Sequence, residues 1–151
     1  MKSVIAKIIL LFLIFFSYAD LNSKPVRIGH LKAQLVSEVE TIKTGEPFWV
    51  ALHLDMDEHW HIYWRNPGDA GLPPKINWEL PEGFKAGEIQ WPYPKRFDVP
   101  PLTSFGYYGE VLLPVQITPP ENLNEGQTIK LIANAEWLVC KEECIPGKGT
   151  F

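Results

Sequence analysis

Apolar and polar residues alternate along most of this chain, and this period-two pattern constrains the fold more than any other feature. It is clearest over residues 48–56, where every second residue is apolar. The pattern recurs over residues 31–35, 76–80, 111–117 and 129–139. Each segment is typical of a half-buried β-strand. Because 14 prolines are spread through the 151 residues, long helices are disfavoured.

Short strands separated by turn sequences predict an all-β domain. Seven or so strands in about 130 residues favour an immunoglobulin-like antiparallel β-sandwich, with a small closed barrel as the alternative. Residues 91–109 (WPYPKRFDVPPLTSFGYYG) break the pattern, since they hold four prolines and six aromatic residues. We expect this segment to form a long, ordered loop, because loops of that length are usually functional.

The first 19 residues have the layout of a secretory signal peptide. Lys2 and Lys7 give a positive start, and residues 8–16 form an apolar run that is too short to cross a bilayer. Small residues at Ser17 and Ala19 fit a cleavage site after Ala19. We therefore expect an exported domain over residues 20–151, with 12 basic and 18 acidic residues and a net charge of −6.

Several functional classes find no support in the sequence. The basic residues form no run, which argues against a nucleic-acid partner. No glycine-rich phosphate loop follows a strand, and no GxSxG nucleophile motif is present. We expect no bound cofactor.

The two cysteines, Cys140 and Cys144, are the strongest candidates for chemistry. In an exported protein they can persist as a disulfide. An extended chain would place them about 13 Å apart, whereas a disulfide needs Cα atoms within about 7 Å. A bridge therefore requires a hairpin turn at residues 141–143, and Pro146 then tolerates only an edge-strand or an irregular position.

Three hypotheses for this pair stay open from the residues alone. A bridge that closes about five residues contributes only about 2 kcal/mol by loop entropy, so it suits a redox-active pair better than a staple. A merely structural disulfide and a metal or free-thiol site are the alternatives. Lys141 favours a thiolate, while Glu142 and Glu143 disfavour one, which predicts a thiol of ordinary acidity.

Two further groups of side chains are candidate sites. His53, His59 and His61 lie within nine residues and, together with the cysteines, are candidate copper or zinc ligands, although no zinc-type spacing is present. A second candidate is an aromatic face that binds a sugar or a peptide, made of Trp60, Tyr63, Trp64, Trp91, Tyr93, Tyr107 and Tyr108. Half of such a set usually belongs to the core.

Three motifs, in order along the chain, carry a resemblance to a known family. Residues 61–74 (HIYWRNPGDAGLPP), 106–115 (GYYGEVLLPV) and 137–146 (WLVCKEECIP) resemble the exported amino-terminal region of DsbD-like and ScsB-like thiol:disulfide interchange proteins. The resemblance covers roughly residues 29–151 and is closest to the ScsB-like branch. It implies an immunoglobulin-like fold and a protein-disulfide reductase activity in the periplasm.

The resemblance also implies partners and residue roles. The partners would be a thioredoxin-like donor domain, a membrane reductase domain and exported substrates such as disulfide isomerases or cytochrome c maturation proteins. By position, Cys144 matches the cysteine that forms the mixed disulfide, and Cys140 matches its resolving mate. Tyr107 or Tyr108 matches an aromatic cap over the disulfide. His61 and Tyr63 fall near the family's aromatic active-site residues.

The sequence departs from the family pattern in two respects. The best-known members have wider cysteine spacing and a phenylalanine cap, and full-length members continue into membrane and thioredoxin-like domains. This chain ends seven residues after Cys144. We interpret it as a fragment, the product of a split gene or a stand-alone carrier, and we expect that its last strand is incomplete. The alternative function is an exported binding or copper-tolerance module with a structural disulfide or a Cys/His metal site.

Overall fold

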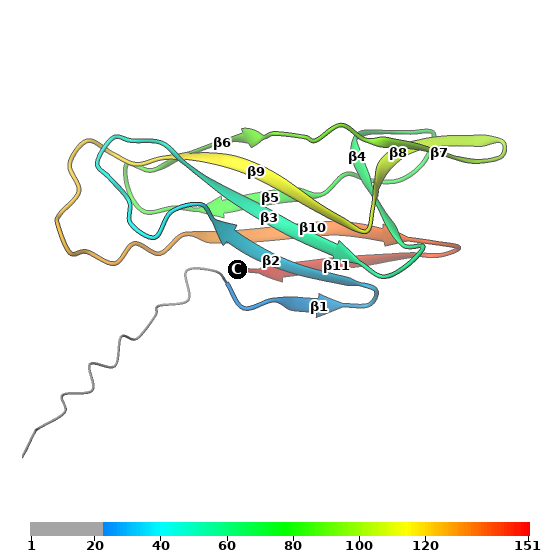
Figure 1. The fold of residues 1–151 in the computed structure, drawn as a ribbon, viewed down its shortest axis with the longest axis horizontal. Helices are drawn as coiled ribbons and strands as arrows, with labels where there is room; N and C mark the ends of the chain where they lie inside the picture. Colours follow the sequence, from blue (N-terminus) through cyan, green and yellow to red (C-terminus); the bar gives the residue numbers. More distant parts are fainter. Residues whose placement is uncertain (1–22) are drawn as a thin grey trace, which may run out of the picture.

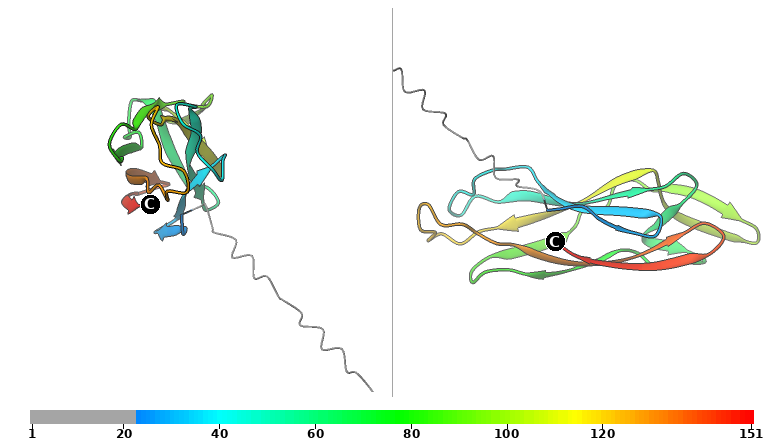
Figure 2. Two further views of the ribbon diagram at one scale, coloured as in Figure 1. Left: turned by 90° about the vertical axis from the view of Figure 1, so that its left-hand side faces the viewer. Right: turned by 90° about the horizontal axis from the view of Figure 1, so that it is seen from below.

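The computed structural model describes residues 23–151, and the predicted signal peptide over residues 1–19 lies outside them. Two antiparallel sheets pack face to face, as the views in Figure 1 and Figure 2 show. The prediction of an immunoglobulin-like β-sandwich is confirmed, and the barrel alternative is wrong. Within the described residues, no helix is long and apolar enough to span a membrane.

The first sheet has five strands in the order β1-β2-β3-β9-β6. Their bounds are Val26–Ile28 for β1, Leu31–Ser37 for β2, Phe48–Met56 for β3, Glu110–Thr118 for β9 and Lys85–Ile89 for β6. Strands β2, β3 and β9 form its centre, with seven register pairs between β2 and β3 and eight between β3 and β9. These central strands are three of those that the alternation predicted.

The second sheet follows the order β11-β10-β4-β8-β7, and β5 pairs with the first half of β10 beside this path. The bounds are Cys144–Thr150 for β11, Ile132–Cys140 for β10, His61–Gly68 for β4, Leu102–Tyr108 for β8, Lys95–Val99 for β7 and Lys75–Glu79 for β5. Strand β11 is an edge strand that contains Pro146, which is one of the two positions that the sequence predicted for this proline.

The core lies between the two sheets and is built by the alternating apolar residues. Leu52, Leu54 and Leu113 of the first sheet and Ile62 and Val139 of the second are fully buried. Because successive side chains in a strand point to opposite faces, the neighbours of the core residues in β4 and β10 lie on the outer face of the second sheet. That outer face carries both His61 and Cys140.

The expectation of a long loop over residues 91–109 is wrong. Strands β7 and β8 occupy most of this segment and pair through five register pairs, from Lys95–Gly106 to Val99–Leu102. The four prolines precede β7 or form the turn between the strands, so none of them removes an N–H group from the ladder. Their number suggested a loop, but their positions permit a hairpin.

Candidate functional site

The β10–β11 hairpin brings the two cysteines together. Seven register pairs join the strands, and the last pair is Cys140 with Cys144 across a turn of three residues. The cysteines form a disulfide with a Cα–Cα distance of 4.1 Å. In the turn, the backbone N–H of Lys141 donates a hydrogen bond of 3.0 Å to the carbonyl of Glu143. The hairpin geometry that the bridge requires is therefore present.

The two halves of the disulfide differ in exposure. Cys140 is 1% exposed, whereas Cys144 lies in an exposed position of the edge strand. Thiol–disulfide exchange needs direct access of a thiolate to one of the two sulfur atoms. The asymmetry therefore leaves Cys144 as the accessible partner and makes Cys140 the buried one.

A row of side chains crosses the outer face of the second sheet beside the disulfide. Cys140 pairs with His61 of β4, and His61 pairs in turn with Tyr108 of β8. Residues in register on adjacent strands point to the same face. The row Cys144, Cys140, His61, Tyr108 therefore places an imidazole and a phenol on the same side of the sheet as the sulfur atoms.

His61 is the centre of a compact group of four rings, here called the aromatic cluster: His61, Tyr63, Phe97 and Tyr108. The His61 ring centroid lies 5.2 Å from Tyr63, 4.5 Å from Phe97 and 5.3 Å from Tyr108. Phe97 and Tyr108 are 5.2 Å apart. Strand β7 contributes Phe97, so the hairpin that replaced the expected loop supplies one wall of the site.

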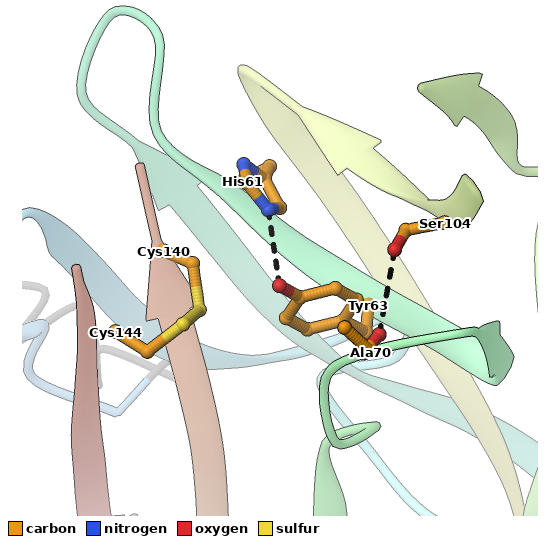
Figure 3. Close-up of a disulfide and its surroundings, with 6 residues drawn as sticks. All are labelled: His61, Tyr63, Ala70, Ser104, Cys140 and Cys144. Carbon is orange, nitrogen blue, oxygen red and sulfur yellow. Dashed lines mark hydrogen bonds between the residues drawn. A yellow bond between two sulfur atoms is a disulfide. The ribbon is translucent and has the colours of Figure 1, made fainter. Parts of the chain in front are cut away.

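Tyr63 is held firmly on this face. A hydrogen bond of 3.3 Å joins its hydroxyl to Nε2 of His61 (Figure 3). The backbone of Gly71 packs directly on the Tyr63 ring, since a Cβ at Gly71 would overlap it. The segment that carries Gly71 is tied to β8, because the N–H of Asp69 donates to the carbonyl of Thr103 over 2.9 Å. These contacts give the glycine-containing motif at residues 61–74 a structural role.

Burial favours the uncharged forms of the ionisable groups in the cluster. His61 is 7% exposed, and desolvation lowers the pKa of its imidazole. Desolvation raises the pKa of Tyr63, with a smaller contribution from Tyr108, and it also raises the pKa of Tyr108. Desolvation therefore favours the neutral form of each of these three rings.

The structure separates the two cap candidates. Tyr108 is 37% exposed and belongs to the aromatic cluster. Tyr107 points to the opposite face, is buried in the core and donates its hydroxyl to the carbonyl of Pro92 over 2.8 Å. Burial raises the pKa of Tyr107 to about 12. Tyr108, and not Tyr107, is therefore brought to the side of the disulfide.

The three histidines proposed as metal ligands do not meet. His53 lies on the outer face of the first sheet and contacts Glu110 at 3.2 Å. His59 lies in the turn before β4 with a positive φ of 70°, and His61 is on the outer face of the second sheet. Across residues 23–151, no three His, Cys, Asp or Glu side chains are grouped so that they could hold a metal ion.

The proposed aromatic binding face also does not form as one surface. Trp60 and Tyr107 are core residues, and Trp64 and Trp91 pack partly buried against the core. Tyr93, in contrast, is 96% exposed. Only Tyr63 and Tyr108 of that set belong to the aromatic cluster. Sequence reasoning missed Phe97, although the alternation of apolar Phe97 and Val99 with charged Arg96 and Asp98 was the available signal.

Comparison with known proteins gives one family and a shared fold. The family model "Thiol:disulfide interchange protein DsbD, N-terminal" matches residues 31–151. The crystal structure of the N-terminal periplasmic domain of ScsB from Proteus mirabilis superposes with a TM-score of 0.64 at 20% identity. The match covers 87% of this chain and 50% of that one, so the chain spans half the length of the ScsB structure.

A second solved structure, the GAE domain of yeast GGA1, superposes with a TM-score of 0.44 at 12% identity and covers 85% of this chain and 95% of its own. None of the curated proteins matches the chain in sequence.

Proposed function

This chain belongs to the family of N-terminal domains of the thiol:disulfide interchange protein DsbD, and from that membership we propose that Cys140 and Cys144 are its redox centre. The observation that carries the proposal is the asymmetric disulfide. It closes a loop of only five residues, with Cys144 exposed and Cys140 covered. A small loop makes a weak staple and leaves the bond free to open and close.

The proposed reaction begins with a thiolate of a reduced partner protein. The thiolate attacks Sγ of Cys144, and the S–S bond breaks so that Cys140 leaves as a thiolate and a mixed disulfide remains. The second partner thiol loses its proton and attacks the partner's own sulfur, which releases Cys144. The partner becomes oxidised to a disulfide, and the Cys140–Cys144 pair gains two electrons and two protons. The same steps in reverse reduce a substrate disulfide.

We assign the electron donor to a thioredoxin-like domain or a membrane reductase domain, and the acceptors to exported proteins such as disulfide isomerases or cytochrome c maturation proteins. Membership of the DsbD family supports this direction of transfer. The predicted signal peptide over residues 1–19 and the periplasmic origin of the similar ScsB domain support a periplasmic location. The domain would act as one part of a protein-disulfide reductase.

Trapping experiments test the redox role and the roles of the two cysteines. The Cys140→Ser variant should accumulate mixed disulfides through Cys144 when it meets an oxidised thioredoxin-like protein. The Cys144→Ser variant should accumulate far fewer, because its remaining thiol is buried. Non-reducing gels and mass spectrometry identify the products. Stronger trapping by Cys144→Ser would reverse the assignment, and no trapping by either variant would contradict the function.

A redox titration separates the carrier from a structural disulfide. We expect the Cys140–Cys144 pair to equilibrate with a thioredoxin-like protein at a potential above about −300 mV. A structural bridge would stay oxidised below that potential. Alkylation of free thiols at each potential of the redox buffer, followed by mass spectrometry, measures the reduced fraction of the domain.

We further propose that Phe97 and Tyr108, which pack against His61 beside Cys140, form a cap that limits the approach of small thiols to the disulfide from this side. Their ring contact is worth about 1 kcal/mol, so replacing both residues by Ala should speed reduction by glutathione about fivefold to tenfold. Tyr93→Ala is the matched control, because Tyr93 is 96% exposed and outside the aromatic cluster. Equal rates for the double variant and the control would refute the cap.

A further inference from the structure

The proposed reaction creates a negative charge in a covered position. When a partner attacks Cys144, the electron pair of the S–S bond leaves with Sγ of Cys140, which is 1% exposed. Burial disfavours a thiolate, and exchange is faster when the leaving thiol has a low pKa. A neighbouring group that stabilises the Cys140 thiolate would therefore control the rate of the step.

His61 is the titratable side chain best placed for that task. It is the register partner of Cys140 on the adjacent strand and points to the same face of the sheet. Cβ atoms of such cross-strand neighbours are about 5 Å apart. Figure 3 shows both sulfur atoms on the side of β10 that faces His61 and Tyr63. The rings of Phe97 and Tyr108 also pack against the imidazole.

Tyr63 fixes the orientation of the imidazole. Its hydroxyl lies 3.3 Å from Nε2 of His61, and a hydroxyl can either donate or accept a hydrogen bond. The contact therefore fits both charge states of His61, because the hydroxyl can donate to a bare Nε2 and can accept from Nε2–H. The Gly71 backbone against the Tyr63 ring keeps the hydroxyl in place.

We propose that His61 takes up a proton as Cys140 becomes a thiolate, so that an imidazolium–thiolate pair stabilises the leaving group, and that Tyr63 is its positioning residue. This inference rests on the proposed function. In the oxidised domain His61 is neutral. After attack at Cys144, the imidazole takes up from the solvent the proton that the attacking partner thiol released, while the electron pair stays on Sγ of Cys140. His61 later returns the proton to Cys140 or to water.

The lowered pKa of His61 fits this cycle, since burial keeps the imidazole neutral until a negative charge forms beside it. The other titratable groups that face the site come from each neighbouring element. They are Cys140 and Cys144 of the hairpin, Tyr63 of β4, Tyr108 of β8, Lys95 of β7 by its register with Gly106, and the turn residues Lys141, Glu142 and Glu143. The charged ones are exposed, so water and salt screen them.

The first test measures the acidity of Cys140 without a partner. In the Cys144→Ser background, Cys140 is the only thiol, and the pH dependence of the ultraviolet absorbance of its thiolate reports the thiolate fraction without reagent access to the buried sulfur. His61→Gln should lower that fraction about tenfold at neutral pH, and Tyr63→Phe should lower it less. His53→Gln is the matched control, because it removes a histidine from the opposite face and should change nothing. An unchanged or larger thiolate fraction in His61→Gln would overturn the proposal.

The second test needs no substitution. NMR titration of the His61 imidazole in the wild-type domain should give a higher pKa in the reduced state than in the oxidised state, because the thiolate is present only after reduction. The same pKa in both states would overturn the proposal even if His61→Gln failed to fold. Neither test uses a redox partner, so a failure of trapping would contradict the proposed function without deciding the role of His61.

Discussion

Reduction of the disulfide should destabilise the domain by only about 2 kcal/mol. The bridge closes a loop of five residues, and the chain-entropy relation gives about 2 kcal/mol for a loop of that size against more than 4 kcal/mol for a loop of about 100 residues. Six register pairs between β10 and β11 remain when the Cys140–Cys144 pair is opened. The hairpin should therefore stay in place without its covalent link.

Urea unfolding of the same chain, oxidised and then reduced with a phosphine, measures this difference without any substitution. A loss of about 2 kcal/mol corresponds to a change of roughly 30-fold in the unfolding equilibrium constant. The dependence of the unfolding free energy on urea concentration should stay the same, because the oxidised and the reduced domain bury the same core and expose it on unfolding. A loss above about 4 kcal/mol, or an unfolded reduced chain, would show that the disulfide is a staple and would contradict the redox role.

The structure predicts two further effects on stability. Gly71→Ala should destabilise the domain by about 2 kcal/mol more than Gly126→Ala, because both glycines have positive φ but only a Cβ at Gly71 meets the Tyr63 ring; equal losses in urea unfolding would contradict the packing role. Burial raises the pKa of Tyr107 to about 12, so the unfolded chain ionises first and the free energy of unfolding should fall as the pH rises from about 10 to 12. Tyr107→Phe should make that fall smaller, and an unchanged pH profile would exclude this tyrosine as its source.

The hairpin at the cysteines could be predicted from the sequence because its constraints are local. Cys144 follows Cys140 by four positions, and a bond between them is impossible unless residues 141–143 turn. Pro146 could be assigned to an edge strand for an equally local reason, the missing N–H group. The fold class followed from the alternation at residues 48–56 and 111–117, since period two sorts apolar side chains onto one face.

The β7–β8 hairpin and its contribution to the site could not be predicted in the same way. The four prolines of residues 91–109 suggested a loop where β7 and β8 form. Only the pairing of β8 with β4 shows that β8 is part of the second sheet. Phe97 reaches His61 through two strand crossings, from β7 to β8 and from β8 to β4. No pattern within one segment carries information about such a contact.

By itself, the sequence determined the alternation that makes two sheets, the position of the turn between the cysteines and the motifs of the DsbD family. These depend on residue type and spacing along the chain, which sterics and hydrogen bonding translate directly into local structure. Only the tertiary structure decided which side chains face the disulfide: it set His61 beside Cys140, turned Tyr107 into the core and left Tyr108 on the outer face. The physical reason is that strand register fixes these neighbours, and a shift by one residue would exchange the two faces.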